Sequence, residues 1–223
     1  MNITQAVVLI TAAGKPIGSA LAQHFARQGA SVVITDTNQH ALEQTHRLCS
    51  VDSEKIYPHV MPGHSLEANI ALFDFIEQSN HQAPTIVLNL CTGFPSTDRL
   101  EATSSDEFVH QLARATGRLL NLGKEAAKRM KTLKQKGVII NIISDGHMVE
   151  LVSSDSACSI VRGFTKSWAD ELLPFNIRVG GILPAPSIHF CDNVAASQDE
   201  LIRHTEYIVA NDHFNGRVMA AQV

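Results

Sequence analysis

Short, almost continuously apolar segments alternate along this chain with longer segments in which apolar residues recur at helical spacing. A strand reads as a continuous apolar run when both faces of its sheet are covered, as in parallel sheets with crossover helices. Such strands are expected at Ala6 to Thr11, Ser31 to Thr35, Thr85 to Leu90, Val138 to Ile143 and Ile177 to Ile182, with a last strand at Arg217 to Ala220. The strands are therefore expected to form a parallel sheet.

The segments between these strands have the periodicity of helices that pack on such a sheet. From Ile17 to Gln28, apolar residues recur at i, i+3, i+4 and i+8, and Gly29 follows in the position of a C-cap. Further helices are expected at Asn38 to Leu48, Ser65 to Gln78, Asp106 to Leu133, Ser154 to Leu173 and Gln198 to Val209. This alternation predicts an α/β fold built on a single doubly wound parallel sheet with helices on both faces.

Composition favours one globular domain that spans residues 1–223. The chain is 44% hydrophobic and 18% charged, which suits a single sizeable core. Its net charge of −4 offers no electrostatic footprint for the phosphate backbone of nucleic acid. We therefore expect no nucleic-acid partner.

Cysteine usage and hydropathy point to the cytoplasm. The four cysteines are far apart and form no C-x-x-C pair, so neither a metal site nor a disulfide framework is expected. The apolar run from Ala6 to Ala13 has no Lys or Arg before it, unlike a signal peptide. No segment is long enough to span a bilayer, so a membrane location is not expected either.

The loop after the first strand has the chemistry of a phosphate-binding turn. Residues 11–18 read Thr-Ala-Ala-Gly-Lys-Pro-Ile-Gly and open directly into a helix, whose N-terminus can present free N–H groups to a pyrophosphate. Gly14 and Gly18 permit close backbone approach. Pro16 lacks an N–H but suits a first helical turn. A triphosphate-binding P-loop is excluded, because no glycine lies five residues before Gly14 and Pro16 stands where Ser or Thr would bind magnesium.

The second strand ends at Asp36, about twenty residues beyond this turn. A carboxylate in that place accepts hydrogen bonds from both ribose hydroxyls and repels the 2′-phosphate of NADP. Asp36 therefore favours NAD(H) over NADP(H). The alternative is that Asp36 is a solvated loop residue or a cap for the helix that starts near Asn38.

Several of these segments resemble the short-chain dehydrogenase/reductase family. Residues 11–18 are similar to the family's T-G-x-x-x-G-x-G turn, although Ala12 and Pro16 replace its first two glycines. Asn89 matches the first position of the family's N-N-A-G, and residues 163–172 and 176–179 match its helix and sixth strand. Asn215-Gly216 resembles the entry to the final strand, so the resemblance covers essentially the whole chain.

This resemblance implies a Rossmann fold that binds a nicotinamide dinucleotide. The residues that it assigns to the cofactor are Thr11, Gly14, Lys15, Ile17, Gly18, Asp36 and Asn89. Family members usually dimerise through the helices that correspond to residues 106–133 and 154–173, so a homodimer or homotetramer is expected. The connection at about 184–200 is short, which implies a reduced substrate lobe.

The family's catalytic positions are mostly altered in this chain. Ser144 fills the place of the catalytic serine, but Ser154 and Cys158 stand where the family has tyrosine and lysine. Tyr57 and Tyr207, the only tyrosines, are not followed four residues later by lysine, so no Tyr-x-x-x-Lys exists in the chain. The family's asparagine is also absent near residues 114–115, and Asn121 lies about two turns too late.

These departures leave three hypotheses. The first is an NAD(H)-binding protein with a degraded active site, weak or inactive in the family's hydride transfer. The second is an active NAD(P)-dependent oxidoreductase on a small carbonyl or alcohol, with Ser144 or His147 in a nonstandard role, since a histidine of pKa about 6.5 can deliver a proton. In the third, no nucleotide binds and the chain has a structural or partner role. The simpler interpretation of His147 is an exposed loop residue, and that of Cys158 a small packed side chain.

Overall fold

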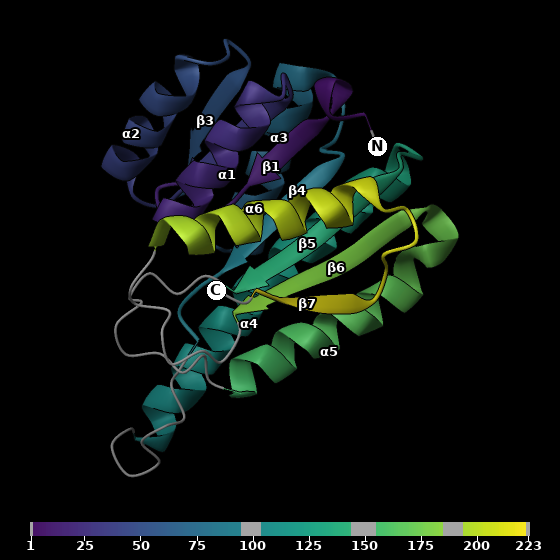
Figure 1. The fold of residues 1–223 in the computed structure, drawn as a ribbon. Helices are drawn as coiled ribbons and strands as arrows, with labels where there is room; N and C mark the ends of the chain where they lie inside the picture. The colour runs from purple at the N-terminus through teal and green to yellow at the C-terminus, as the bar shows by residue number, and fades with distance from the viewer. Residues whose placement is uncertain (1, 95–103, 144–154, 185–193, 222–223) are drawn as a thin grey trace.

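A computed structural model describes residues 2–94, 104–143, 155–184 and 194–221. Within these residues, seven strands form one parallel sheet in the order β3-β2-β1-β4-β5-β6-β7 (Figure 1). The strands are β1 (Val7–Ile10), β2 (Ser31–Asp36), β3 (Ile56–Val60), β4 (Ile86–Cys91), β5 (Gly137–Ile143), β6 (Ile177–Pro184) and β7 (Arg217–Ala221). The fold is the doubly wound α/β sheet that the sequence predicts.

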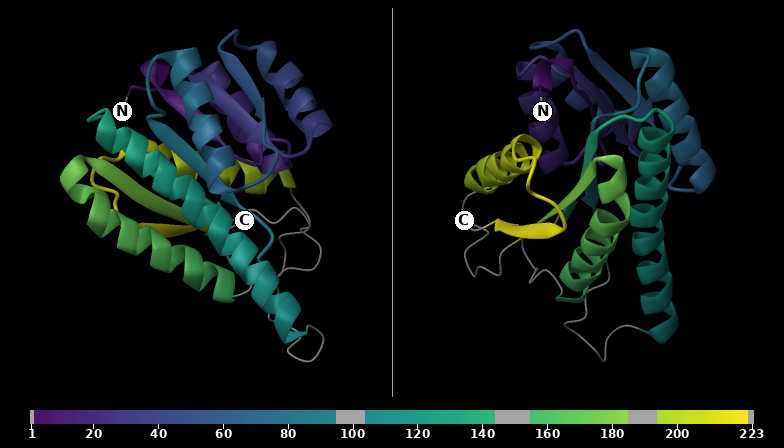
Figure 2. Two further views of the ribbon diagram at one scale, coloured as in Figure 1. Left: turned by 180° about the vertical axis from the view of Figure 1, so that it is seen from behind. Right: turned by 90° about the vertical axis from the view of Figure 1, so that its right-hand side faces the viewer.

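Helices cover both faces of this sheet (Figure 2). One face carries α1, α2 and α6, and the other carries α3, α4 and α5. The helices are α1 (Pro16–Arg27), α2 (Gln39–Ser50), α3 (Leu66–Asn80), α4 (Ser105–Thr132), α5 (Asp155–Leu172) and α6 (Val194–Ala210), with short 3-10 turns η1 (Ile3–Gln5) and η2 (Leu173–Phe175). Each of the expected helices is present, and its ends shift by a few residues at most.

Alternate strand residues explain the two-sided core. On β1, Val8 and Ile10 pack into the cluster under α1 and α6, whereas Val7 and Leu9 pack into the cluster under α3 and α4. All four side chains are buried, with exposures of 1% or less. A strand that is buried on both faces needs apolar residues at every position, and this is why the strands read as continuous apolar runs.

One strand was not expected from the sequence. β3 lies at the edge of the sheet, pairs only with β2, and contains Pro58 and His59. Proline cannot donate a ladder hydrogen bond and is tolerated on an edge strand, while the alternating exposure of the strand removes the continuous apolar run. The strand extends the sheet on the β2 side and carries its following loop toward the carboxyl end of β2.

β1 lies between β2 and β4, so the chain reverses its direction of winding there. In an open α/β sheet, such a reversal leaves a crevice at the carboxyl ends of the strands. No helix in the described parts of the chain is long and apolar enough to cross a bilayer. The same residues contain no cluster of His, Cys, Asp and Glu side chains suited to a metal ion.

Candidate functional site

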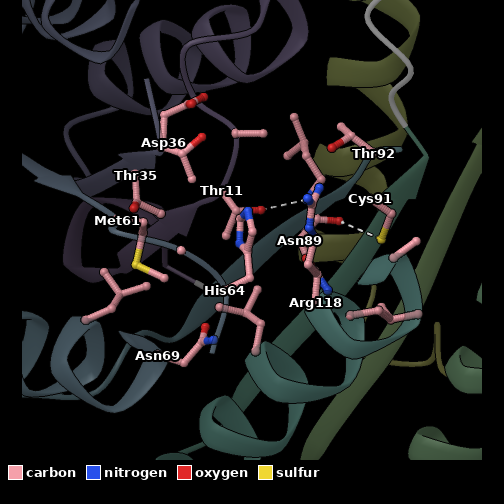
Figure 3. Close-up of a pocket in the computed structure, with 18 of the residues that line it drawn as sticks. Thr11, Thr35, Asp36, Met61, His64, Asn69, Asn89, Cys91, Thr92 and Arg118 are labelled. Atoms are coloured by element: carbon pink, nitrogen blue, oxygen red, sulfur yellow. Dashed lines mark hydrogen bonds between the residues drawn. The ribbon is translucent and has the colours of Figure 1, made fainter. Parts of the chain in front are cut away.

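A cavity of about 450 Å³ opens at this crevice (Figure 3). One wall comes from the loop after β1 and from the ends of β2 and β3, and the other comes from the end of β4 and from α4. Four of the residues assigned to the cofactor line it, namely Thr11, Lys15, Asp36 and Asn89. Gly14, Ile17 and Gly18 do not line it but belong to the turn and first helical residues at its edge.

Side chains from neighbouring elements fix the turn after β1. The Thr11 hydroxyl accepts a hydrogen bond from Leu90 N at 2.9 Å, which joins the end of β1 to β4. Thr45, buried on α2, donates to the Ala13 carbonyl at 2.9 Å. The turn is therefore held from both sides before any ligand binds.

The two glycines that remain in the turn are required by close packing. A Cβ on Gly18 would lie 2.5 Å from the Ala12 carbonyl oxygen, closer than any real contact. A Cβ on Gly14 would lie 2.7 Å from the Ala41 Cβ and 3.0 Å from a carboxylate oxygen of Asp36. These glycines let the turn fold tightly over the start of α1, as a phosphate-binding turn requires.

The first turn of α1 leaves backbone donors for a ligand. Gly14 N donates to Asp36 and Lys15 N donates to Ala12 O, so neither is available. Pro16 occupies the first helical position and has no N–H. Within the described residues, the N–H groups of Ile17 and Gly18 have no hydrogen-bond acceptor. Such groups at a helix N-terminus favour an anion.

Asp36 faces the cavity from the end of β2. One carboxylate oxygen accepts from Gly14 N at 3.0 Å and the other from Asn38 N at 2.9 Å. A carboxylate can accept about four hydrogen bonds, so lone pairs remain for a ligand. Asn38 caps α2 by accepting from Ala41 N at 3.1 Å, and Asp36 therefore does not serve as that cap.

Thr35 is a cavity residue that the sequence did not single out. Its side chain is 2% exposed, and among the described residues its hydroxyl oxygen has no hydrogen-bond partner. Leaving a buried hydroxyl unpaired costs roughly 1–3 kcal/mol. An unpaired hydroxyl beside Asp36 suits a cavity that takes a polar ligand.

Two basic side chains also line the cavity, His64 from the loop after β3 and Arg118 from α4. Burial lowers the pKa of His64, and Arg118 lowers that pKa further, although Asp36 raises it. Burial, with a smaller effect of Arg114, also lowers the pKa of Arg118. Asn121, on α4, donates to the His64 carbonyl at 3.1 Å and so attaches the loop after β3 to this helix. The sequence offered no signal for His64, because β3 itself was not expected.

The comparison with known proteins identifies the family. A family model described as short chain dehydrogenase matches residues 6–191. The chain belongs to the short-chain dehydrogenase family. Members of this family are oxidoreductases whose Rossmann-like fold binds a nicotinamide dinucleotide. The close glycine packing, the unpaired Thr35 hydroxyl and the donors of α1 fit such a group.

Several short-chain dehydrogenases and related proteins resemble this chain. The probable galactose dehydrogenase GalD of Rhizobium meliloti is 31% identical over 186 residues, which are 79% of this chain and 70% of GalD. The probable oxidoreductase EphD of Mycobacterium tuberculosis is 28% identical over 69% of this chain but 26% of its own, so the chain spans about a quarter of that relative. A 3-ketoacyl-(acyl-carrier-protein) reductase from Brucella melitensis, complexed with NADH, has a TM-score of 0.75 at 19% identity and covers 96% of each chain.

Asn89, the residue that matches the family's N-N-A-G, is tied into the sheet. Its side-chain amide donates to the Asn141 side chain at 3.2 Å, and Asn141 in turn donates to the Thr165 hydroxyl at 3.2 Å. These buried amides connect β4 and β5 to α5. Asn89 thus borders the cavity while its amide is linked to α5 through Asn141.

The catalytic end of this short-chain dehydrogenase is only partly described. Ser144, His147 and Ser154 lie outside the described residues. Cys158 is on α5 and packs partly buried against the apolar cluster that includes Cys91 and Leu119. This placement agrees with the interpretation of Cys158 as a small packed side chain. Cys158 stands where the family resemblance places a lysine.

The two tyrosines lie far from this end of the molecule. Tyr57 is on β3, at the sheet edge opposite to β7, and is separated from β5 by several strands. Tyr207 is on α6, is half exposed, and accepts a hydrogen bond from Asn211 at 2.9 Å. Neither tyrosine lines the cavity.

Proposed function

We propose that the chain binds NAD(H) in the cavity, in preference to NADP(H). The observation that carries the proposal is the position of Asp36, which faces the cavity with free lone pairs beside the unpaired Thr35 hydroxyl. A carboxylate in this place accepts from the ribose hydroxyls and repels a 2′-phosphate.

We assign different residues to different parts of the cofactor. Asp36 and Thr35 hold the adenosine ribose, and the free N–H groups of Ile17 and Gly18 hold the phosphates with the charge of Lys15 nearby. Thr11, Gly14 and Asn89 keep the turn and the cavity wall in place. The bound cofactor would supply a hydride donor or acceptor. NADH bound to the Brucella reductase supports this assignment, because that protein has the same fold.

We further propose that the chain is weak or inactive in the family's hydride transfer. Reduction of a carbonyl needs a proton donor at the oxygen, and removal of a positioned acid or base costs roughly 10² to 10⁴ in rate. The sequence lacks the family's tyrosine and lysine pair, and the described tyrosines lie away from the cavity. A binding, sensing or partner role is then the function that remains.

Thermal unfolding with and without nucleotide tests the binding proposal. A ligand that binds the native state raises the melting temperature by mass action. We expect NADH to raise it more than NADPH does at equal concentration. Asp36→Ala should remove most of the NADH effect, whereas Asp52→Ala, which changes a carboxylate that pairs with Arg27 outside the cavity, should leave it unchanged. Equal shifts in the Asp36→Ala and wild-type proteins would contradict the assignment of Asp36.

Turnover across a panel of small carbonyls and alcohols tests the second proposal. We expect NADH consumption no faster than in buffer with the same cofactor. Clear activity that His147→Ala or Ser144→Ala abolishes would instead establish an active oxidoreductase with nonstandard residues.

We propose one domain over residues 1–223 with a small substrate lobe near 184–200, of which residues 185–193 lie outside the described part. A cytoplasmic location is proposed on the cysteine usage, and a homodimer or homotetramer on the family resemblance.

A further inference from the structure

Arg118 is a partly buried cation that has no carboxylate partner among the described residues. It lies on the α4 wall of the cavity, and among the described residues no acidic side chain is within ion-pair distance of it. Its neighbour one helical turn away, Arg114, has the same charge. Like charges at this spacing destabilise a helix, and a desolvated cation without a partner is costly. Both costs fall if the cavity receives an anion.

The guanidinium is placed where it can reach such an anion. Figure 3 shows Arg118 beside Asn89 and Cys91, across the cavity from Asp36 and Thr35. Its Nη1 is 3.6 Å from the position that a Cβ on Gly93 would take, just beyond the end of β4. Arg118 and the turn after β1 therefore line one cavity from opposite sides.

The helix that carries Arg118 is fixed on the sheet. Leu119 and Leu122, the next residues on its inner side, are 1% and 4% exposed. Asn121 of the same turn holds the loop after β3 through the His64 carbonyl. The backbone of Arg118 is therefore held beside the cavity, and only its side chain has to become ordered on a ligand.

The turn after β1 has fewer donors for phosphate than its length suggests. Pro16 has no N–H, and the N–H groups of Gly14 and Lys15 are bonded within the protein. Ile17 and Gly18 remain as the free donors of this turn among the described residues. Two phosphates offer more acceptor oxygens than these two groups can satisfy. A donor on the other wall could therefore bind the oxygens that remain.

We propose that Arg118 binds the diphosphate of the nucleotide from the α4 side and replaces the donor that Pro16 removes. The inference rests on the proposed nucleotide site and adds a phosphate-binding residue to it. The cavity then has acceptors at Asp36 for hydroxyls and cationic donors at Arg118 for phosphate, and charge-assisted bonds to phosphate are stronger than neutral ones.

Calorimetric titration with ADP and with adenosine tests this role directly, because the two ligands differ only in the diphosphate. Arg118→Met keeps most of the side-chain length and removes the charge. We expect this variant to weaken ADP binding about tenfold or more and to change adenosine binding less than about twofold. Arg114→Met is the matched control, since Arg114 is exposed and does not line the cavity, and it should change either affinity little.

Each outcome decides the inference. Equal weakening of ADP and adenosine would overturn it, because the lost contact would then be to the adenosine part that both ligands share. An unchanged ADP affinity in a variant with a wild-type melting temperature would overturn it as well. If the wild-type protein binds NADH but not ADP at millimolar concentration, this inference fails alone; if NADH does not bind either, the proposed function fails with it. A smaller salt dependence of ADP affinity in Arg118→Met is the expected second readout, because a charge contact to phosphate has been lost.

Discussion

Ala12 has a left-handed backbone conformation, with φ of 49°, at the position where the family resemblance places a glycine. This conformation costs a residue with a Cβ about 1–2 kcal/mol. We expect Ala12→Gly to raise the free energy of unfolding by up to about 1 kcal/mol, since glycine's extra freedom in the unfolded chain offsets part of the gain. Urea denaturation measures this change.

Ala13 is the control for that substitution. It is fully buried in the core under α1 and does not have positive φ. Ala13→Gly should therefore destabilise the protein. Stabilisation by both substitutions, or by neither, would count against strain at Ala12.

Stability should fall on mild acidification because burial lowers the pKa of both His59 and His64. The unfolded histidines have a pKa near 6.5, so below about pH 7 the unfolded chain binds more protons than the native protein. This contribution to stability is complete above that pH and is lost as the pH falls through the lowered native values. The loss of stability can be measured as a fall in the urea midpoint between pH 8 and about 5.5.

His64→Asn should reduce the change of stability with pH. His110→Asn, which changes an exposed residue of α4, should not. The groups that face His64 are Asp36 and Arg118, with Arg114 one turn from Arg118. An unaltered slope in His64→Asn would show that His64 is not the group responsible.

Residue types alone indicated part of the site. Asp36 and the glycine turn were predictable because both follow strands that read clearly in the sequence. Thr35, His64 and Arg118 were not, because their placement at the cavity depends on which side chains meet across it. An unpaired hydroxyl or an unbalanced cation is a property of the packed structure, and no local pattern encodes it.

Helix α4 packs against α5 through a glycine that receives an indole ring. A Cβ on Gly123 would lie 2.2 Å from the Trp168 ring. In an exposed helix, glycine to alanine stabilises by up to about 1 kcal/mol, but here we expect Gly123→Ala to destabilise by about 1–3 kcal/mol through overpacking. Urea denaturation gives the sign.

Gly117 provides the opposite case on the same helix. A Cβ there meets nothing within 4 Å, so Gly117→Ala should be neutral or stabilising. Stabilisation of similar size in both variants would contradict the packing of Trp168 on Gly123.

The end of α6 depends on a buried arginine of β6. Arg178, 8% exposed, donates to the carbonyls of Ile208, Val209 and Phe214 at 2.7, 3.0 and 3.2 Å. Arg178→Met leaves these acceptors unpaired, and we expect a loss of about 3 kcal/mol in the free energy of unfolding. Arg178→Lys keeps the charge but has fewer N–H donors, and its loss in the free energy of unfolding should be smaller. A loss under about 0.5 kcal/mol in the methionine variant would show that water replaces the guanidinium.

At the scale of elements, the buried strands and the helices were predictable because each has a single strong periodicity. The edge strand β3 was not, because half-exposed residues and Pro58 remove the apolar run. That strand carries the loop with Met61 and His64 to the cavity. Because β3 was not expected, the predicted site did not include the residues of this loop.

The whole molecule leaves apolar surface on the side of α4 next to α5. Val109 is 60% exposed and Leu120 is 42% exposed, beside a groove that includes Phe164 and Trp168. Burial of this surface is expected in the homodimer or homotetramer. Light scattering should give a multiple of the chain mass, and Val109→Asp should shift it toward the monomer because a charge would be buried.

Val51→Asp is the control for this prediction, since Val51 is 85% exposed beyond the end of α2. It should leave the mass unchanged. A strict monomer for the wild-type protein would refute the expected assembly.

The proposed functions of this chain all require nucleotide binding at the crevice between β1 and β4. The most direct test is calorimetric titration of the purified protein with NADH and, separately, with NADPH. We predict saturable binding of NADH and weaker binding of NADPH, because Asp36 accepts from a ribose diol and repels a 2′-phosphate. No binding of either nucleotide at millimolar concentration would contradict the account and would leave a structural or partner role for this chain.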